Sequence, residues 1–407
     1  MIEKDNNIKN GFFKKYYDDG QLKEEGSYLN GERDGLFKCY HKVGQIHTEI
    51  NYINGERDGL FKYYEYGQIQ TEINYKNGER NGLFKCYHKN GQIEVEINYV
   101  NGEKILYKSY YSKGQLRYEG NFVNGEIVGL SKWYYSNGQI HTEINYMNGE
   151  RNGLFKCYYE NGQIEEEGNY ENGEKEAFQR KYFKNGQVQS ESFFKNGQIE
   201  RESNYVNGEK ISYKVYYSKG QIYKDINYVN SLRECHKIYY ENGQLKEEVT
   251  YKNNNPIGLH KNFYENGQIK EEVNYINGRI EGLIKSYYSK GQLRYENNYM
   301  NGERDGLFKC YYENGQIRET VNLKINKIEG LLKSYYSNGQ IHTEINYMNG
   351  ERNGLFKCYY ENGQIEEEGN YENGEKDGLF KDYNENGQII SKQSWVNGEL
   401  DLFKSTL

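Results

Sequence analysis

The chain has 407 residues, of which 35% are hydrophobic even with its 46 tyrosines counted, and this excludes a set of globular domains with thick aliphatic cores. An aromatic content of 16% favours a folded chain, because disordered segments are poor in aromatic residues. The net charge of −7 comes from 53 basic and 60 acidic residues interleaved along the chain, which leaves no polybasic segment for a nucleic-acid partner.

The first ten residues show no sign of a targeting segment. Met1 and Ile2 are followed by charged and polar residues, and no run of about 18 apolar residues, the length of a membrane-spanning helix, occurs anywhere in the sequence. We therefore expect a cytoplasmic protein in which residues 1–10 form an N-terminal cap.

Repeats fill the rest of the chain. The dipeptide Gly-Gln recurs every 23 or 24 residues, except for an 11-residue step from Gly186 to Gly197. This spacing predicts hairpin repeats over 11–185 and 201–393, a shortened repeat over 186–200, and a C-terminal capping strand over 394–407. The stretch 134–175 recurs unchanged as 335–376, which indicates recent duplication.

Each repeat is predicted to be a β-hairpin. The unit over 153–175 contains two runs of alternating character, and each run is followed by Asn-Gly, the strongest short-range hairpin signal. The sequence therefore predicts an all-β fold: an elongated tandem array of antiparallel β-hairpins that form a twisted or curled single-layer meander sheet.

The strand register can be predicted from the turn. A two-residue turn at 161–162 would pair Tyr159 with Ile164 and Lys156 with Glu167. Lysine would then face an acidic residue across many hairpins, which opposes a one-residue slip of the register. The same construction gives Lys14–Glu25, Lys38–Glu49, Lys132–Glu143, Lys214–Asp225, Lys261–Glu272, Lys285–Glu296 and Lys357–Glu368, whereas Lys309 faces Thr320 and Lys381 faces Lys392.

The shortened repeat at 186–200 lacks one strand. A meander that loses a strand moves every later Gly-Gln turn to the opposite edge of the sheet, unless the array breaks and restarts. We therefore expect such a change of edge, or a kink, at this segment.

Catalytic and metal-binding chemistry is not expected. Five of the six cysteines occupy one slot of the repeat, too far apart for disulfides, and no histidine pairs with another His or Cys at metal-ligand spacing. The carboxylates recur in every unit, whereas catalysis needs one differentiated site. We predict no enzyme activity, no catalytic residues, no cofactor and no metal.

The repeat resembles the variant class of MORN repeats. The resemblance is carried by Gly35-Leu36-Phe37-Lys38-Cys39-Tyr40, Gly44-Gln45-Ile46 and Tyr52-Ile53-Asn54-Gly55-Glu56, and again by residues 354–375. It implies a MORN-like hairpin array. Bacterial proteins of this kind are commonly labelled antitoxins of toxin–antitoxin systems, and MORN proteins at large bind proteins or anionic phospholipids.

Our functional hypothesis is a non-enzymatic scaffold that binds a protein partner, with an antitoxin or immunity component as one form of it. The alternatives are a peripheral binder of anionic lipid membranes and a surface carbohydrate-binding module. A homodimer would be a competing use of the same surface. Strand alternation places the candidate partner-binding residues on the aromatic side of the sheet: Phe155, Tyr159, Ile164, Tyr170, Phe356, Tyr360, Ile365 and Tyr371.

Overall fold

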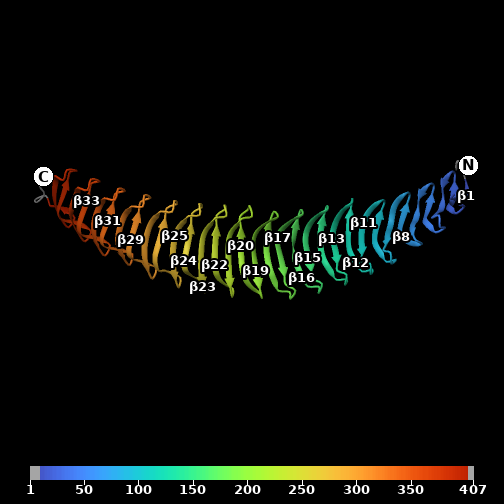
Figure 1. Ribbon diagram of the computed structural model, residues 1–407, viewed down its shortest axis with the longest axis horizontal. Helices are drawn as coiled ribbons and strands as arrows, with labels where there is room; N and C mark the ends of the chain where they lie inside the picture. Colours follow the sequence, from blue (N-terminus) through green and yellow to red (C-terminus); the bar gives the residue numbers. More distant parts are fainter. Residues whose placement is uncertain (1–9, 402–407) are drawn as a thin grey trace. The chain divides into compact units, whose positions relative to one another are not determined.

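The computed structural model describes residues 10–401, so most of the predicted N-terminal cap and the last six residues of the predicted C-terminal cap lie outside the described residues. The chain divides into two compact units, residues 1–200 and 201–407. The division falls at the end of the segment 186–200 that the sequence marks as irregular. Figure 1 shows that each unit is built from strands that lie side by side in chain order.

The described residues form 37 strands and no helix. The strands of the first unit are β1 (Gly11–Tyr16), β2 (Leu22–Leu29), β3 (Glu32–Arg33), β4 (Gly35–Tyr40), β5 (Ile46–Ile53), β6 (Glu56–Arg57), β7 (Gly59–Glu65), β8 (Gln68–Lys76), β9 (Glu79–Tyr87), β10 (Ile93–Val100), β11 (Glu103–Tyr110), β12 (Leu116–Val123), β13 (Glu126–Tyr134), β14 (Ile140–Met147), β15 (Glu150–Tyr158), β16 (Ile164–Glu171), β17 (Glu174–Tyr182) and β18 (Val188–Lys195). The boundary between the units falls within β19 (Gln198–Val206).

The strands of the second unit continue the same alternation. They are β20 (Glu209–Tyr216), β21 (Ile222–Val229), β22 (Leu232–Tyr239), β23 (Leu245–Lys252), β24 (Asn255–Phe263), β25 (Ile269–Ile276), β26 (Arg279–Ile280), β27 (Gly282–Tyr287), β28 (Leu293–Met300), β29 (Glu303–Tyr311), β30 (Ile317–Lys324), β31 (Lys327–Tyr335), β32 (Ile341–Met348), β33 (Glu351–Tyr359), β34 (Ile365–Glu372), β35 (Glu375–Tyr383), β36 (Ile389–Val396) and β37 (Glu399–Leu400). Within each unit neighbouring strands pair antiparallel, as in β15 with β16 and β33 with β34. The short strands β3, β6 and β26 each share a partner with the strand that follows: β2 pairs with β3 and β4, β5 with β6 and β7, and β25 with β26 and β27. The predicted all-β meander of hairpins is confirmed.

Two kinds of turn connect the strands. A tight turn of two residues, such as Asn148-Gly149, has positive φ at both positions, which Asn and Gly tolerate and a type I′ turn requires. The Gly-Gln turns are longer, except those at Gly67 and Gly197, which are tight turns. In the turn over 159–163, the Tyr159 amide donates to the Gln163 carbonyl at 2.9 Å and the Gly162 amide donates to the Tyr159 carbonyl at 2.8 Å.

The longer turn corrects one part of the predicted register. Lys156 faces Glu167 as expected, but a β-bulge follows and Ile164 faces Tyr158 instead of Tyr159. The two-residue turn predicted here was wrong because only Gly162, and not the residue before it, has a positive φ. The other predicted lysine pairings are confirmed: Lys14–Glu25, Lys38–Glu49, Lys132–Glu143, Lys214–Asp225, Lys261–Glu272, Lys285–Glu296, Lys357–Glu368, Lys309–Thr320 and Lys381–Lys392.

A row of apolar side chains along the middle of one face supplies the core of each unit, and we call this face the aromatic face. In the first unit Phe13, Phe37 and Ile50 form a buried cluster, with Tyr28 and Tyr52 packed edge-on against the Phe37 ring. The corresponding cluster of the second unit comprises Ile345, Phe356, Tyr371 and Phe380. A single layer buries this row because large rings lie beside small residues and half-buried tyrosines flank them.

The shortened repeat interrupts the alternation of tight and long turns. β19 is preceded by the tight turn Asn196-Gly197 and followed by the tight turn Asn207-Gly208, all with positive φ. Three strands, β18, β19 and β20, therefore separate the long turns over 183–187 and 217–221, in place of the usual two. The edge on which the later turns lie stays a prediction.

Candidate protein-binding surfaces

The residues predicted to bind a partner fall into two groups of four, one in each unit. Phe155 and Phe356 lie in the core rows and are 5% and 9% exposed. Phe155 faces Gly168 across the hairpin, and Phe356 faces Gly369 in the same way. These two rings stabilise the sheet and have little surface left for a partner.

The tyrosines of this set also have structural partners. Arg151 donates from Nη1 to the Tyr170 hydroxyl at 3.2 Å, and its guanidinium lies 5.3 Å from the centre of that ring. Arg352 makes the same contacts with Tyr371, at 3.2 and 5.2 Å. The arginine thus covers the tyrosine row of the aromatic face, through hydrogen bonding and cation–π attraction.

Tyr159 and Tyr360 lie in long turns and connect successive repeats. The Tyr159 hydroxyl donates to the Tyr182 carbonyl at 2.7 Å, and the Tyr360 hydroxyl donates to the Tyr383 carbonyl at 2.7 Å. The turn tyrosines of most other repeats make the same bond, for example Tyr264 to Tyr287. Ile164 and Ile365, which begin the following strands, are half-buried. The partner-binding role of all eight residues stays a prediction.

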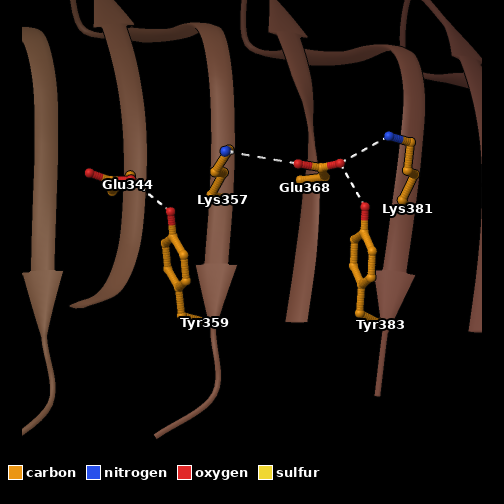
Figure 2. A network of polar contacts seen from close by, with 6 residues as sticks. All are labelled: Glu344, Lys357, Tyr359, Glu368, Lys381 and Tyr383. Carbon is orange, nitrogen blue, oxygen red and sulfur yellow. Dashed lines mark hydrogen bonds and ion pairs between the residues drawn. The ribbon is translucent and has the colours of Figure 1, made fainter. Parts of the chain in front are cut away.

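The opposite face carries a ladder of lysine and glutamate, and we call it the leucine face after the row that adjoins the ladder. Figure 2 shows that Glu368 lies between lysines of both neighbouring strands: Lys381 Nζ is 3.0 Å from Oε1 and Lys357 Nζ is 4.0 Å from Oε2. The ladder therefore runs across successive hairpins and is not confined to each one. Exposed ion pairs of this kind contribute little individually, about 0.2–1 kcal/mol, but their repetition sets the register.

A tyrosine hydroxyl completes most steps of this ladder. Tyr383 donates to Glu368 Oε1 at 2.7 Å, and Tyr359 donates to Glu344 Oε2 at 2.9 Å (Figure 2). The sequence analysis missed this bond, although a Glu-to-Tyr spacing of 14 or 15 residues recurs through the chain. Burial, followed by the bond to Glu344, raises the pKa of Tyr359 to about 12. The hydrogen bond from Lys333 is the main cause that lowers the pKa of Glu344.

Large apolar side chains are exposed in two rows of the leucine face, near the tight turns. One row is the leucine of the Gly-Leu dipeptide that recurs in most repeats, such as Leu355 after Gly354, and Leu355 is the most exposed member at 63%. The second row is the Ile, Val or Met that precedes the tight turn. Exposed members are Leu36, Leu60, Leu83, Leu130, Leu154, Ile53, Val100, Val123 and Met147 in the first unit, and Leu259, Leu283, Leu307, Leu331, Leu355, Leu379, Val206, Val229, Ile276, Met300, Met348 and Val396 in the second.

The described part of the chain shows neither a metal-binding cluster nor a disulfide. Residues 10–401 contain no group of three or more His, Cys, Asp or Glu side chains placed to hold a metal ion. The six cysteines are free thiols, and burial raises the pKa of Cys157 and Cys310. Within the same residues there is no helix long and apolar enough to cross a membrane.

The family comparison matches almost the whole chain. The family model described as a MORN repeat variant matches at sixteen places: 9–30, 33–54, 57–77, 80–101, 105–124, 127–148, 151–172, 179–196, 191–207, 235–253, 256–277, 280–301, 304–324, 328–349, 352–373 and 376–397. No curated protein matches the sequence.

Three solved structures that match most of this chain are only weakly similar to it. The Photorhabdus luminescens Tc holotoxin pore is 13% identical over 96% of this chain and 23% of that chain, with a TM-score of 0.16. The TcdB2-TccC3 crystal structure is 9% identical over 95% of this chain and 31% of that chain, with a TM-score of 0.13. This chain spans less than a third of either toxin chain. A structure titled as a eukaryotic initiation factor is 10% identical over 88% of this chain and 98% of that chain, with a TM-score of 0.14. Similarity at this level carries no argument about function.

Proposed function

Because the chain belongs to the MORN repeat variant family and is a scaffold of repeated hairpins, we propose that it binds a protein partner and catalyses no reaction. The exposed apolar rows of the leucine face are the observation that carries the proposal. Monomeric proteins rarely expose large contiguous apolar patches, and larger ones mark interaction sites.

The leucine face suits a protein better than a membrane. Its apolar rows adjoin a ladder in which lysine and glutamate alternate, as in the pairing of Lys333 with Glu344 at 2.8 Å. An anionic membrane surface attracts clusters of basic residues, whereas interleaved charges give no net attraction. A protein partner can match both the apolar row and the alternating charges.

The proposal places contact on the leucine face and not on the aromatic face expected from the sequence. The burial of Phe155 and Phe356 and the hydrogen bonds made by Tyr159 and Tyr360 support this placement. An antitoxin or immunity role is the narrower form of the same proposal, in which the partner would be a toxin protein.

The test is capture from the native cell. The full chain is immobilised, exposed to cell extract, and the retained proteins are identified by mass spectrometry, while liposomes with and without anionic lipid are tested for co-sedimentation. We expect one or a few proteins to be retained in stoichiometric amounts, and no binding to liposomes. Co-sedimentation with anionic liposomes and no retained protein would contradict the proposal.

A further inference from the structure

Two histidines meet at the long turn that joins β4 to β5. His41 begins the turn over 41–45: its amide donates to the Gln45 carbonyl at 2.8 Å, and its carbonyl accepts from the Gly44 amide at 2.8 Å. His47 is the second residue of β5 and lies at the β-bulge that follows the turn. The centres of the two imidazole rings are 4.3 Å apart, and both side chains are half-buried. The turn therefore places two potential metal ligands side by side.

The same two positions bring rings together in other repeats, but there the first ring is a phenol. Tyr135 and His141 have ring centres 4.5 Å apart, and Tyr336 and His342 have ring centres 4.6 Å apart. Of these three pairs, one in the second unit and two in the first, only the pair at 41 and 47 consists of two imidazoles. The sequence analysis did not recognise this pair, because the turn and not the spacing brings the two residues together.

The ring nitrogens of the histidine pair are not used by the fold. In the corresponding pair, the Tyr135 hydroxyl donates to the Tyr158 carbonyl at 2.6 Å, and Nδ1 of His141 lies 3.2 Å from the Thr142 hydroxyl. Within residues 10–401, the rings at 41 and 47 make no hydrogen bond or ion pair through their nitrogens. Because a neutral imidazole nitrogen is the commonest metal ligand in proteins, these nitrogens are available for an ion.

The ring spacing fits two neighbouring ligands of one metal ion. With metal–nitrogen bonds of about 2.0–2.1 Å, the ion lies about 3.2 Å from the centre of each ligating imidazole. Two such rings at a right angle around the ion have centres about 4.5 Å apart, and at the tetrahedral angle about 5.2 Å. The observed 4.3 Å is closer to the right angle, which is the arrangement typical of Ni²⁺ and Cu²⁺. The ring planes are tilted by 56° and are not parallel, so a nitrogen of each can point to a common position.

Contacts on the far side restrict one of the two rings. The His47 ring packs edge-on against the Tyr63 ring, with centres 5.2 Å apart, and Tyr63 faces Thr48 on the neighbouring strand β7. The backbone of His41 is fixed by the hydrogen bonds of the turn. Ligands that are already held in place lose less conformational freedom when they bind an ion.

We propose that His41 and His47 bind one divalent transition-metal ion, Ni²⁺ or Cu²⁺, through one imidazole nitrogen each. Since residues 10–401 contain no group of three or more His, Cys, Asp or Glu that could hold a metal, water completes the coordination of the ion. The proposal replaces the expectation of no metal drawn from the sequence. It does not depend on the protein partner proposed above.

Titration of the untagged full chain with Ni²⁺, followed by calorimetry, tests this proposal. We expect the parent chain to bind one equivalent that both His41→Tyr and His47→Gln lack. His41→Tyr recreates the pair found at 135 and 141, so the sheet should be retained, and circular dichroism checks this. Ni²⁺ should also raise the melting temperature of the parent and not of the two variants, because the ion binds the folded pair. No binding by the parent, or equal binding by the parent and both folded variants, would overturn the proposal.

A gained site is the sharper test. Tyr135→His places a second imidazole beside His141, where the ring centres are already 4.5 Å apart, and we expect this variant to bind two equivalents of Ni²⁺. Tyr111→His is the matched control, because Tyr111 also begins a long turn but Arg117 occupies the second position of its pair. It should bind one equivalent, as the parent does. One equivalent in Tyr135→His, or two in Tyr111→His, would show that the ring pair is not what binds the ion.

Discussion

The ring of Phe37 on β4 lies so close to Gly26 on β2 that a β-carbon on this glycine would come within 2.6 Å of it. On its other side Phe37 faces Ile50 of β5, and the ring is 1% exposed. Gly26 therefore accommodates the ring, so one small residue beside one large one lets a single-layer sheet bury an aromatic side chain.

We predict that Gly26→Ala destabilises the first repeats by about 1–3 kcal/mol, because the added methyl group overpacks the site. Amide hydrogen exchange in β2 and β4 should become faster, with little change in the second unit. Combining the substitution with Phe37→Leu should recover part of the loss. Unchanged exchange in the single variant would show that the ring moves aside without cost.

Replacing the tyrosines that hydrogen-bond to the ladder glutamates should lower the stability of the strands that carry the ladder. Tyr359→Phe removes the hydrogen bond to Glu344 and should cost about 1 kcal/mol, because a half-exposed bond to a carboxylate is partly replaced by water. Tyr335→Phe is the matched control, since the residue fifteen positions before Tyr335 is Thr320 and not glutamate. Local unfolding measured by hydrogen exchange should change in the first variant only.

The same bond predicts a sensitivity to alkaline pH. The pKa of Tyr359 is raised from its ordinary value of 10.0 to about 12, so the folded state holds this proton more tightly than the unfolded state. The contribution of Tyr359 to the free energy of unfolding is complete below pH 10 and is lost as the pH rises towards 12. The free energy of unfolding should fall over this interval, and less steeply in Tyr359→Phe. Equal slopes for the two proteins would contradict this assignment.

A buried histidine should make the second unit sensitive to acid. Burial, followed by the charge of Lys224, lowers the pKa of His236 from 6.5; Arg233 and His260 act in the same direction and Glu247 opposes them. The unfolded state therefore gains protons first as the pH falls below 6.5, and stability is lost. Exchange of β22 should accelerate in this range.

The control for this effect replaces His236 with valine, the residue type that faces it on the next strand. His236 faces Val249, and its Nε2 has no hydrogen-bond partner in the described residues. His236→Val should remove the acid sensitivity and raise stability at neutral pH. A variant that remains as sensitive as the parent would place the titrating group elsewhere.

The hairpin array could be predicted from the sequence because its signals are local and repeated. Each Asn-Gly marks a turn, and the alternation around it fixes which residues face each other, so the pairing of Lys156 with Glu167 followed from the numbering alone. The long turn at 159–163 could not be predicted by the same rule, because Asn-Gly is compatible with turns of different length. Its form depends on the backbone of Asn161, which does not adopt a positive φ.

The candidate surface was harder to predict than the fold. Alternation identifies the two faces but does not show which one is buried. From the sequence alone, Phe155 and Leu154 are equally good candidates for contact with a partner. Burial of Phe155 depends on Gly168 opposite it and on Tyr170 of the same hairpin, whose ring lies 4.9 Å from that of Phe155. The ladder bonds were missed for a similar reason: Tyr158 donates to Glu143, fifteen residues away on the other side of a tight turn.

The central claim is that a protein partner binds the leucine face, and one affinity measurement tests it most directly. The protein captured by the full chain is purified, and its dissociation constant is measured for the parent chain and for two triple variants, with circular dichroism confirming that the sheet is retained. The leucine-face variant is Leu283→Gln, Leu307→Gln and Leu331→Gln, and the aromatic-face variant is Tyr159→Ala, Tyr170→Ala and Tyr360→Ala. We predict that the leucine-face variant loses about 100-fold in affinity, which corresponds to about 1 kcal/mol for each exposed leucine, while the aromatic-face variant loses much less. Normal binding by the folded leucine-face variant, together with loss of binding by the folded aromatic-face variant, would contradict the account.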